Sequence, residues 1–277
     1  MISGKTLLIA HIGYPIEDFK APLIFNPWFE KKMIDAVVVP MGVKAEDYAA
    51  ALPAIRKLTN LRGALITMPH KVKTLSLLDE VTATARIAGA CNAILVRPDG
   101  TLLGEQFDGA GFVRGVERKG MKLAGIRALV CGNGGVGSAI AASLAAAGVG
   151  ELALYDISSD VSRSLAGRLR DHYPKLVLQT GSNDPAGYDL VVNATPLGMK
   201  AGDPLPFDVS RISPRTFVGE VVMKQTITPL LAAAQARGCA IQVGTDMLFE
   251  MIPAYLELYG LGTATPEELR AVSQIKS

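Results

Sequence analysis

The chain has 277 residues, a length that accommodates two domains of ordinary size. Hydrophobic residues make up 49% of it, charged residues 19%, and the formal net charge is only +2. Such a composition is typical of a well-buried globular protein and argues against nucleic-acid or membrane-surface binding. The N-terminal apolar run is too short for a signal peptide, and no stretch reaches the length of a membrane span. We therefore expect a soluble, cytoplasmic monomer or homodimer.

The first part of the chain alternates short apolar runs with segments of helical periodicity. Strands are predicted at 6–10, 36–39 (ended by Pro40) and 63–67, helices at 22–33 and 45–58, a loop from His11 to Pro22, and a hairpin over 93–103. This alternation predicts a parallel sheet, and groups beyond the carboxyl ends of its strands would line a ligand crevice.

The second part of the chain continues in the same way. Helices are predicted at 109–119, 136–147, from Thr228-Pro229, at 246–259 and at 266–275, with strands at 128–131, 152–155, 176–179, 190–193, 217–222 and 240–243. The three cysteines, Cys91, Cys131 and Cys239, are far apart and lie in apolar stretches. They are expected to be reduced core residues, and their spacing does not suggest a metal site.

A glycine motif joins the strand at 128–131 to the helix that follows it. Gly132, Gly134 and Gly137 have the G-x-G-x-x-G spacing. In a dinucleotide site the first glycine permits a tight turn and the second allows the backbone to approach a pyrophosphate. The third permits close packing of helix on strand, and the helix N-terminus offers free N–H groups. The context of strand, glycines and helix predicts a dinucleotide cofactor.

The acid that ends the next strand indicates which dinucleotide. Asp156 can accept hydrogen bonds from a ribose 2′-hydroxyl and would repel a 2′-phosphate. Ile157 and Ser158 follow it, and Arg163 is the first nearby cation. The sequence therefore predicts NAD rather than NADP.

A nicotinamide oxidoreductase needs a group that exchanges a proton with the substrate hydroxyl. None of the three histidines, His11, His70 and His172, has a neighbouring acid that suggests a dyad. Lys71 follows the strand at 63–67 and is the better candidate, although residue type alone favours a solvated surface lysine. Asp108, before a Gly-Ala-Gly turn, could by itself be a helix cap.

An ordered series of motifs changes this balance. It comprises Gly13-Tyr-Pro-Ile16 with Pro22-Leu, Thr67-x-Pro69-x-Lys71, Gly89-Ala-x-Asn92, Asp108-Gly-x-Gly-Phe112, Gly132-Asn-Gly-Gly135, Asn193-Ala-Thr-Pro-Leu-Gly-Met199, Thr228-Pro-Leu-Leu231 and Gly244-x-x-Met-Leu248. The series spans almost the whole chain and resembles the shikimate dehydrogenase family. The resemblance implies an α/β fold with a substrate lobe (1–108), a Rossmann NAD(P)-binding domain (109–243) and C-terminal helices (244–277) that return to the first lobe.

The resemblance also implies roles for individual residues. Lys71 would transfer the proton, and Asp108 would be its partner and bind substrate hydroxyls, with Thr67 and Asn92 also contacting the substrate. The positions implied for the cofactor are Gly132, Asn133, Gly134, Gly135, Val136, Asp156, Asn193, Thr195, Val221 and Gly244. NADP-dependent members carry an Asn-Arg-Thr-like run where this chain has Asp156-Ile-Ser158, in agreement with the NAD prediction. No metal site is expected.

The substrate side departs from the family pattern. The two serines that hold the substrate carboxylate correspond here to Phe19 and Ala21, an Asn to Leu65, a Tyr to Met223 and a Gln to Met251. Each change removes a hydrogen-bonding group, at a cost of about 1–3 kcal/mol for a buried polar ligand. We therefore expect weak activity on shikimate and a differently anchored substrate.

The predicted function is reversible, NAD-dependent hydride transfer on a ring hydroxyl of shikimate, quinate or a related cyclic hydroxy acid. Two alternatives stay open. One is an ordinary NADP-dependent shikimate dehydrogenase that holds the substrate carboxylate by other groups, with Lys20 as the first candidate. The other is a sensor that binds NAD without turnover.

Overall fold

The computed structural model describes residues 2–275 and divides into two compact units. The first unit contains the chain up to Phe107 and from Met251 onward, and the second contains Asp108–Glu250. The division falls inside helix α9 (Gly244–Leu258). The sequence-based domain ranges remain a prediction, because compactness does not show that these parts fold independently.

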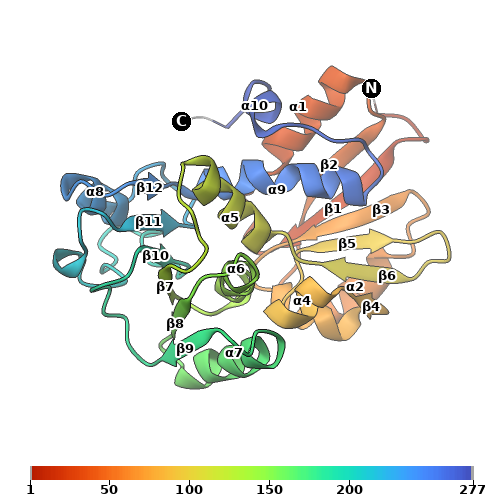
Figure 1. The fold of residues 1–277 in the computed structure, drawn as a ribbon. Helices are drawn as coiled ribbons and strands as arrows, with labels where there is room; N and C mark the ends of the chain where they lie inside the picture. The colour runs from red at the N-terminus through yellow and green to blue at the C-terminus, as the bar shows by residue number, and fades with distance from the viewer. Residues whose placement is uncertain (1, 276–277) are drawn as a thin grey trace. The chain divides into compact units, whose positions relative to one another are not determined.

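The first unit is built on a six-stranded mixed sheet (Figure 1). Its elements are β1 (Leu7–Gly13), α1 (Pro22–Lys32), β2 (Ala36–Gly42), α2 (Tyr48–Ile55), β3 (Leu61–Ile66), α3 (Lys71–Thr74), η1 (Leu75–Leu77), β4 (Glu80–Val81), α4 (Ala83–Ala88), β5 (Ala93–Val96), β6 (Leu102–Glu105) and α10 (Pro266–Arg270). The strand order is β2-β1-β3-β5-β6-β4. The sequence predicted a parallel sheet, but this sheet is mixed, because the β5–β6 hairpin places β5 antiparallel to β3.

Two strand ends in this unit differ from the prediction. β1 continues through His11 to Gly13, because it pairs with β2 on one side and with β3 on the other. Pro40 does not end β2, which runs on to Gly42. β2 lies at the sheet edge, where a proline without an N–H group can be accommodated on the unpaired side.

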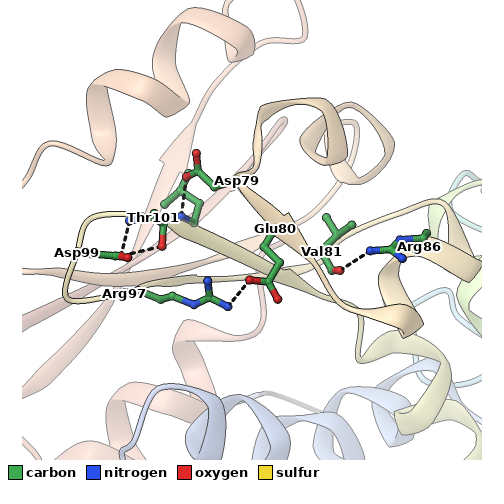
Figure 2. A network of polar contacts seen from close by, with 8 residues as sticks. Asp79, Glu80, Val81, Arg86, Arg97, Asp99 and Thr101 are labelled. Carbon is green, nitrogen blue, oxygen red and sulfur yellow. Dashed lines mark hydrogen bonds and ion pairs between the residues drawn. The ribbon is translucent and has the colours of Figure 1, made fainter.

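The predicted hairpin is confirmed, and polar contacts hold its turn and its neighbour β4 (Figure 2). Asp99 accepts hydrogen bonds from the backbone and the hydroxyl of Thr101 at 3.0 and 2.7 Å. Arg97 pairs with Glu80 of β4 at 2.7 Å. These contacts stabilise the end of the sheet furthest in strand order from β1.

The end of α9 packs on this sheet through two buried tyrosines. Tyr255 donates a hydrogen bond to the backbone oxygen of Asn92, and Tyr259 donates to that of Ala64, at 3.0 and 2.9 Å. Each hydroxyl thereby satisfies a carbonyl next to β5 or within β3. Strand β3 is therefore fixed in part by a segment almost 200 residues later in the chain.

The second unit contains a six-stranded, all-parallel sheet in the order β12-β11-β10-β7-β8-β9. Its elements are α5 (Asp108–Arg118), β7 (Arg127–Cys131), α6 (Gly135–Ala146), β8 (Glu151–Tyr155), α7 (Ser159–His172), β9 (Val177–Thr180), β10 (Leu190–Asn193), η2 (Val209–Arg211), β11 (Phe217–Glu220), α8 (Pro229–Ala236) and β12 (Ile241–Gln242). The strand order reverses at β7, which has β8 on one side and β10 on the other. In doubly wound sheets, such a switch point is where ligands bind.

Helices α5 and α6 lie side by side in this unit (Figure 1). The predicted strands and helices are all present, with ends shifted by a few residues. The prediction missed α7, although Leu165, Ala166 and Leu169 lie on its buried face at helical spacing. The three cysteines are free and buried as predicted, and burial raises the pKa of Cys91 and Cys131 to about 12. The α/β fold class with a Rossmann-type sheet is confirmed.

Candidate active site

The three motif glycines of the second unit have the geometry that a dinucleotide loop requires. Gly132 has φ +89°, and a Cβ there would lie 2.7 Å from the backbone carbon of Ala194. A Cβ on Gly137 would lie 1.8 Å from the backbone oxygen of Gly132, so α6 can approach β7 only because Gly137 has no side chain. Gly134, at the N-cap of α6, has nothing within 4 Å of its Cβ position. The open face at Gly134 fits a pyrophosphate against the α6 N-terminus, which Gly135 and Val136 begin.

Asp156 is held against this loop by two backbone N–H groups. Its carboxylate accepts from Asn133 at 2.8 Å and from Ser158 at 3.0 Å. The Asn133 side chain is buried, donates to the Val130 carbonyl and accepts from the Ser162 hydroxyl at 2.8 Å. Asn133 thus orders the loop with its amide, while Asp156 keeps further lone pairs that can accept hydrogen bonds.

A buried polar network follows β10 and β11, and the sequence analysis missed its central carboxyl group, Glu220. Asn193 donates to Glu220 at 2.7 Å and accepts from the backbone and hydroxyl of Thr195 at 3.0 and 2.6 Å. Glu220 also accepts from the hydroxyl of Thr228, the N-cap of α8. Burial raises the pKa of Glu220. The network fixes the loop that carries Asn193 and Thr195, at the carboxyl end of the strand next to β7.

Lys71 lies at the start of α3 and is 9% exposed, which excludes the alternative of a solvated surface lysine. The preceding residue, His70, stacks on Tyr48 with ring centroids 3.9 Å apart and contacts the Val43 carbonyl at 2.7 Å. The backbone oxygen of Lys71 accepts from Cys91 at 2.8 Å. Contacts on both sides of Lys71 therefore position it at the carboxyl-terminal edge of the first sheet.

Other predicted substrate residues of the first unit converge on Gly13, at the end of β1. A Cβ on Gly13 would lie 2.3 Å from the Thr67 methyl group and 2.8 Å from the Phe19 ring. The Phe19 ring in turn stacks on His11, with centroids 4.1 Å apart. Lys71 is close enough to His11 for its charge to lower the pKa of the imidazole. Thr67, Phe19, His11 and Lys71 thus form one cluster.

Asn92 is also buried at this sheet, just before β5. Its side-chain oxygen accepts from the backbone of Phe107 at 2.9 Å, and its side-chain nitrogen has no hydrogen-bond partner within residues 2–275. A buried donor without a partner suggests that a ligand completes it. Asn92 therefore has one atom that orders the chain just before Asp108 and one buried donor that none of the described residues satisfies.

The remaining predicted residues divide between the units. Ala21 and Met251 are buried in the first unit. Asp108 begins α5, Val221 and Met223 follow β11, and Gly244 begins α9, all in the second unit. A Cβ on Gly244 would lie 2.2 Å from the Val222 carbonyl, so this position requires glycine. Across the described residues, no helix is long and apolar enough to cross a membrane, and no group of His, Cys, Asp or Glu could hold a metal.

The second unit is thus a doubly wound dinucleotide-binding unit, and the first carries a cluster around a buried lysine. This arrangement defines a class of nicotinamide-dependent oxidoreductases with a separate substrate unit. Residues 11–94 match the family described as shikimate dehydrogenase substrate binding domain. The shikimate dehydrogenase (NADP(+)) of Acidiphilium cryptum is 35% identical over 279 aligned residues, covering 99% of this chain and 98% of that protein.

Two solved structures are also similar over nearly the whole chain. Quinate dehydrogenase from Corynebacterium glutamicum, solved with NAD, has a TM-score of 0.84 and 31% identity, covering 96% of this chain and 98% of that one. The 5-ketofructose reductase of Gluconobacter sp. strain CHM43 has a TM-score of 0.85 and 25% identity, with 98% of both chains covered. The chain belongs to the shikimate dehydrogenase family and is an NAD(P)-dependent oxidoreductase of the shikimate and quinate dehydrogenase type.

Proposed function

We propose that this protein oxidises and reduces a ring hydroxyl of quinate, shikimate or a related polyhydroxylated compound, with Lys71 exchanging the hydroxyl proton. The observation that carries the proposal is the burial of Lys71 beside Thr67 and His11 at the edge of the first sheet. The bound nicotinamide would accept or supply the hydride. The ammonium or amine of Lys71 would give or take the proton. By the family resemblance, Asp108 would bind a substrate hydroxyl.

The test compares Lys71 with a lysine two residues further along the same short helix. Lys73 is exposed, so Lys73→Ala is a matched control for the loss of one charge. Lys71→Ala should lower kcat by about 10²–10⁴-fold, the usual effect of losing a general acid–base group, and should leave NAD affinity unchanged. Equal turnover in the two variants would contradict the role of Lys71. If the wild-type protein binds NAD but converts neither the two acids nor an uncharged polyhydroxylated compound, the sensor alternative is favoured.

We further propose that the cofactor is NAD, although the curated relative is named for NADP(+). Asp156 supports this, because its carboxylate is fixed at the loop by Asn133 and Ser158 and would repel a 2′-phosphate. Ile157 follows it with 97% of its surface exposed, where NADP-dependent members carry an arginine. No guanidinium is therefore supplied at the position that would bind that phosphate.

The cofactor proposal is tested by installing the Asn-Arg-Thr run. The triple variant Asp156→Asn, Ile157→Arg and Ser158→Thr should raise the ratio of NADP to NAD kcat/KM by at least about tenfold. Asp171→Asn removes an exposed carboxylate near the far end of α7 and controls for the loss of one negative charge. A wild-type preference for NADP would refute the argument from Asp156.

The substrate side lacks the usual carboxylate anchors. Phe19 and Ala21 have no side-chain donors, and Phe19 is packed on His11. The double variant Phe19→Ser and Ala21→Ser should lower KM for shikimate, whereas unchanged kinetics would contradict this reading of the pocket. One structural neighbour is named for 5-ketofructose, a sugar that has no carboxylate. This supports testing uncharged polyhydroxylated compounds beside the cyclic acids.

A further inference from the structure

His11 occupies a special place in the cluster of the first unit. It pairs in parallel register with Leu65 of β3, so the two side chains are neighbours on one face of the sheet. Leu65 stands where the family pattern has an asparagine. The imidazole of His11 therefore offers a hydrogen-bonding group on β1 directly beside the position on β3 that lacks one.

The surroundings of His11 leave one ring nitrogen available to a ligand. The imidazole is 7% exposed, and its Nδ1 atom has no hydrogen-bond partner among the described residues. The Phe19 ring covers it in a near-parallel stack, with 28° between the planes. Phe19 replaces one of the serines that hold the substrate carboxylate in the family. Phe19, which stands in the position of that serine, thus fixes the orientation of the His11 ring.

The charge of the site indicates what Nδ1 can bind. Burial, and then the positive charge of Lys71, lower the pKa of His11 to about 3. The imidazole is therefore neutral at neutral pH and cannot form an ion pair with a carboxylate. A neutral imidazole nitrogen can donate to a carbonyl or exchange donor and acceptor roles with a hydroxyl, according to its tautomer.

We propose that His11 is a substrate-specificity residue whose Nδ1 binds a hydroxyl or carbonyl oxygen of an uncharged, polyhydroxylated substrate, in place of the amide missing at Leu65. This inference rests on the proposed function, because it places the substrate beside Lys71. It narrows the substrate class to compounds that carry no carboxylate next to Phe19.

The experiment measures steady-state kinetics of the full-length protein with four probes. Quinate, shikimate and myo-inositol are tested with NAD, and 5-keto-D-fructose is tested with NADH. The uncharged probes should have the higher kcat/KM. His11→Phe keeps a ring against Phe19 and removes Nδ1, and it should raise KM for the uncharged probes about tenfold, the usual effect of one lost hydrogen bond. KM for the nicotinamide cofactor should not change.

Two further variants separate a binding role from a structural one. The double variant His11→Val and Leu65→Asn returns the polar group to β3, and it should recover much of the binding lost in His11→Val. His172→Phe alters an exposed histidine of α7 and should have no effect. Unchanged KM values in His11→Phe, or a clear preference of the wild type for the two acids, would overturn the inference.

Calorimetric binding of the same probes distinguishes this inference from the proposed function. Binding without turnover that weakens in His11→Phe would refute the proposed reaction and support the role of His11. Turnover and binding that are both insensitive to His11→Phe would refute only the role of His11. Wild-type protein that neither binds nor converts any probe would overturn the inference as well.

Discussion

Adding one methyl group at Gly134 or at Gly137 should have opposite effects on stability and cofactor binding. A Cβ at Gly137 would lie 1.8 Å from the Gly132 carbonyl oxygen and 2.8 Å from its carbon. Both are backbone atoms, so no side-chain rotation can relieve the contact. A Cβ at Gly134 would meet nothing within 4 Å, and its φ of −69° suits alanine.

These geometries translate into different magnitudes. Gly137→Ala forces α6 away from the loop, and overpacking of this kind costs about 1–3 kcal/mol. For a chain of this size, that corresponds to a fall in melting temperature of roughly 2–12 °C. Gly134→Ala should change the melting temperature little, because a gain of about 0.4–1 kcal/mol through the unfolded state is offset by the preference for glycine over alanine at an N-cap. It should weaken NAD binding at least about tenfold, because the methyl group occupies the space where the pyrophosphate meets the backbone.

Thermal melting of the cofactor-free variants and titration with NADH fluorescence measure the two quantities separately. The expected pattern is a destabilised Gly137→Ala and a stable Gly134→Ala that binds NADH poorly. Wild-type NADH affinity in Gly134→Ala would show that this glycine does not face the cofactor. Wild-type melting in Gly137→Ala would show that the close approach of α6 to Gly132 is not as tight as the structure indicates.

Three further predictions concern buried ionisable groups. The folded-state pKa of His11, about 3 against an ordinary 6.5, means that its stabilising contribution is complete above pH 6.5 and is lost as the pH falls toward 3. Between pH 6.5 and pH 5, the free energy of unfolding of His11→Phe should fall by about 2 kcal/mol less than that of the wild type. The same pH dependence in both proteins would contradict this. Burial raises the pKa of Glu220 above its ordinary 4.5, so the contribution of this group to the free energy of unfolding is complete below pH 4.5 and is lost as the pH rises through the folded-state pKa. Glu220→Gln should therefore flatten the dependence of melting temperature on pH above pH 4.5, and an unchanged slope would refute this prediction. Arg118→Met should destabilise the protein by about 1–2 kcal/mol in denaturant melts, because Glu250 is 3% exposed and Arg118, 2.5 Å away, is half exposed; a loss equal to that of the exposed Lys73→Ala would count against it.

The dinucleotide loop could be predicted from the sequence because its determinants are local. The turn at Gly132, the close packing at Gly137 and the carboxylate of Asp156 all fall within a single strand–helix–strand unit. In that unit, glycine spacing and apolar periodicity specify the backbone almost completely. The same locality explains why the hairpin around Pro98–Gly100 was also predicted correctly.

Strand ends and sheet direction were less predictable because they depend on partners distant in the chain. His11 belongs to β1 because β2 and β3 both continue beside it, and Pro40 stays within β2 because that strand has a free edge. Neither fact is visible in the local run of residues. The network around Glu220 was missed for the same reason, since Asn193 and Thr228 reach it from other elements.

Lys71 shows where sequence reasoning about chemistry ends and packing begins. Lys71 and Lys73 lie in the same four-residue helix, two positions apart, and have the same intrinsic chemistry. The structure buries the first and exposes the second, because the stacked pair of His70 and Tyr48 and the hydrogen bond from Cys91 hold the start of the helix against the sheet. Periodicity in so short a segment cannot distinguish the two lysines. The motif resemblance selected Lys71, and the tertiary contacts give the physical reason: only this amine is held among buried groups where its charge acts on His11.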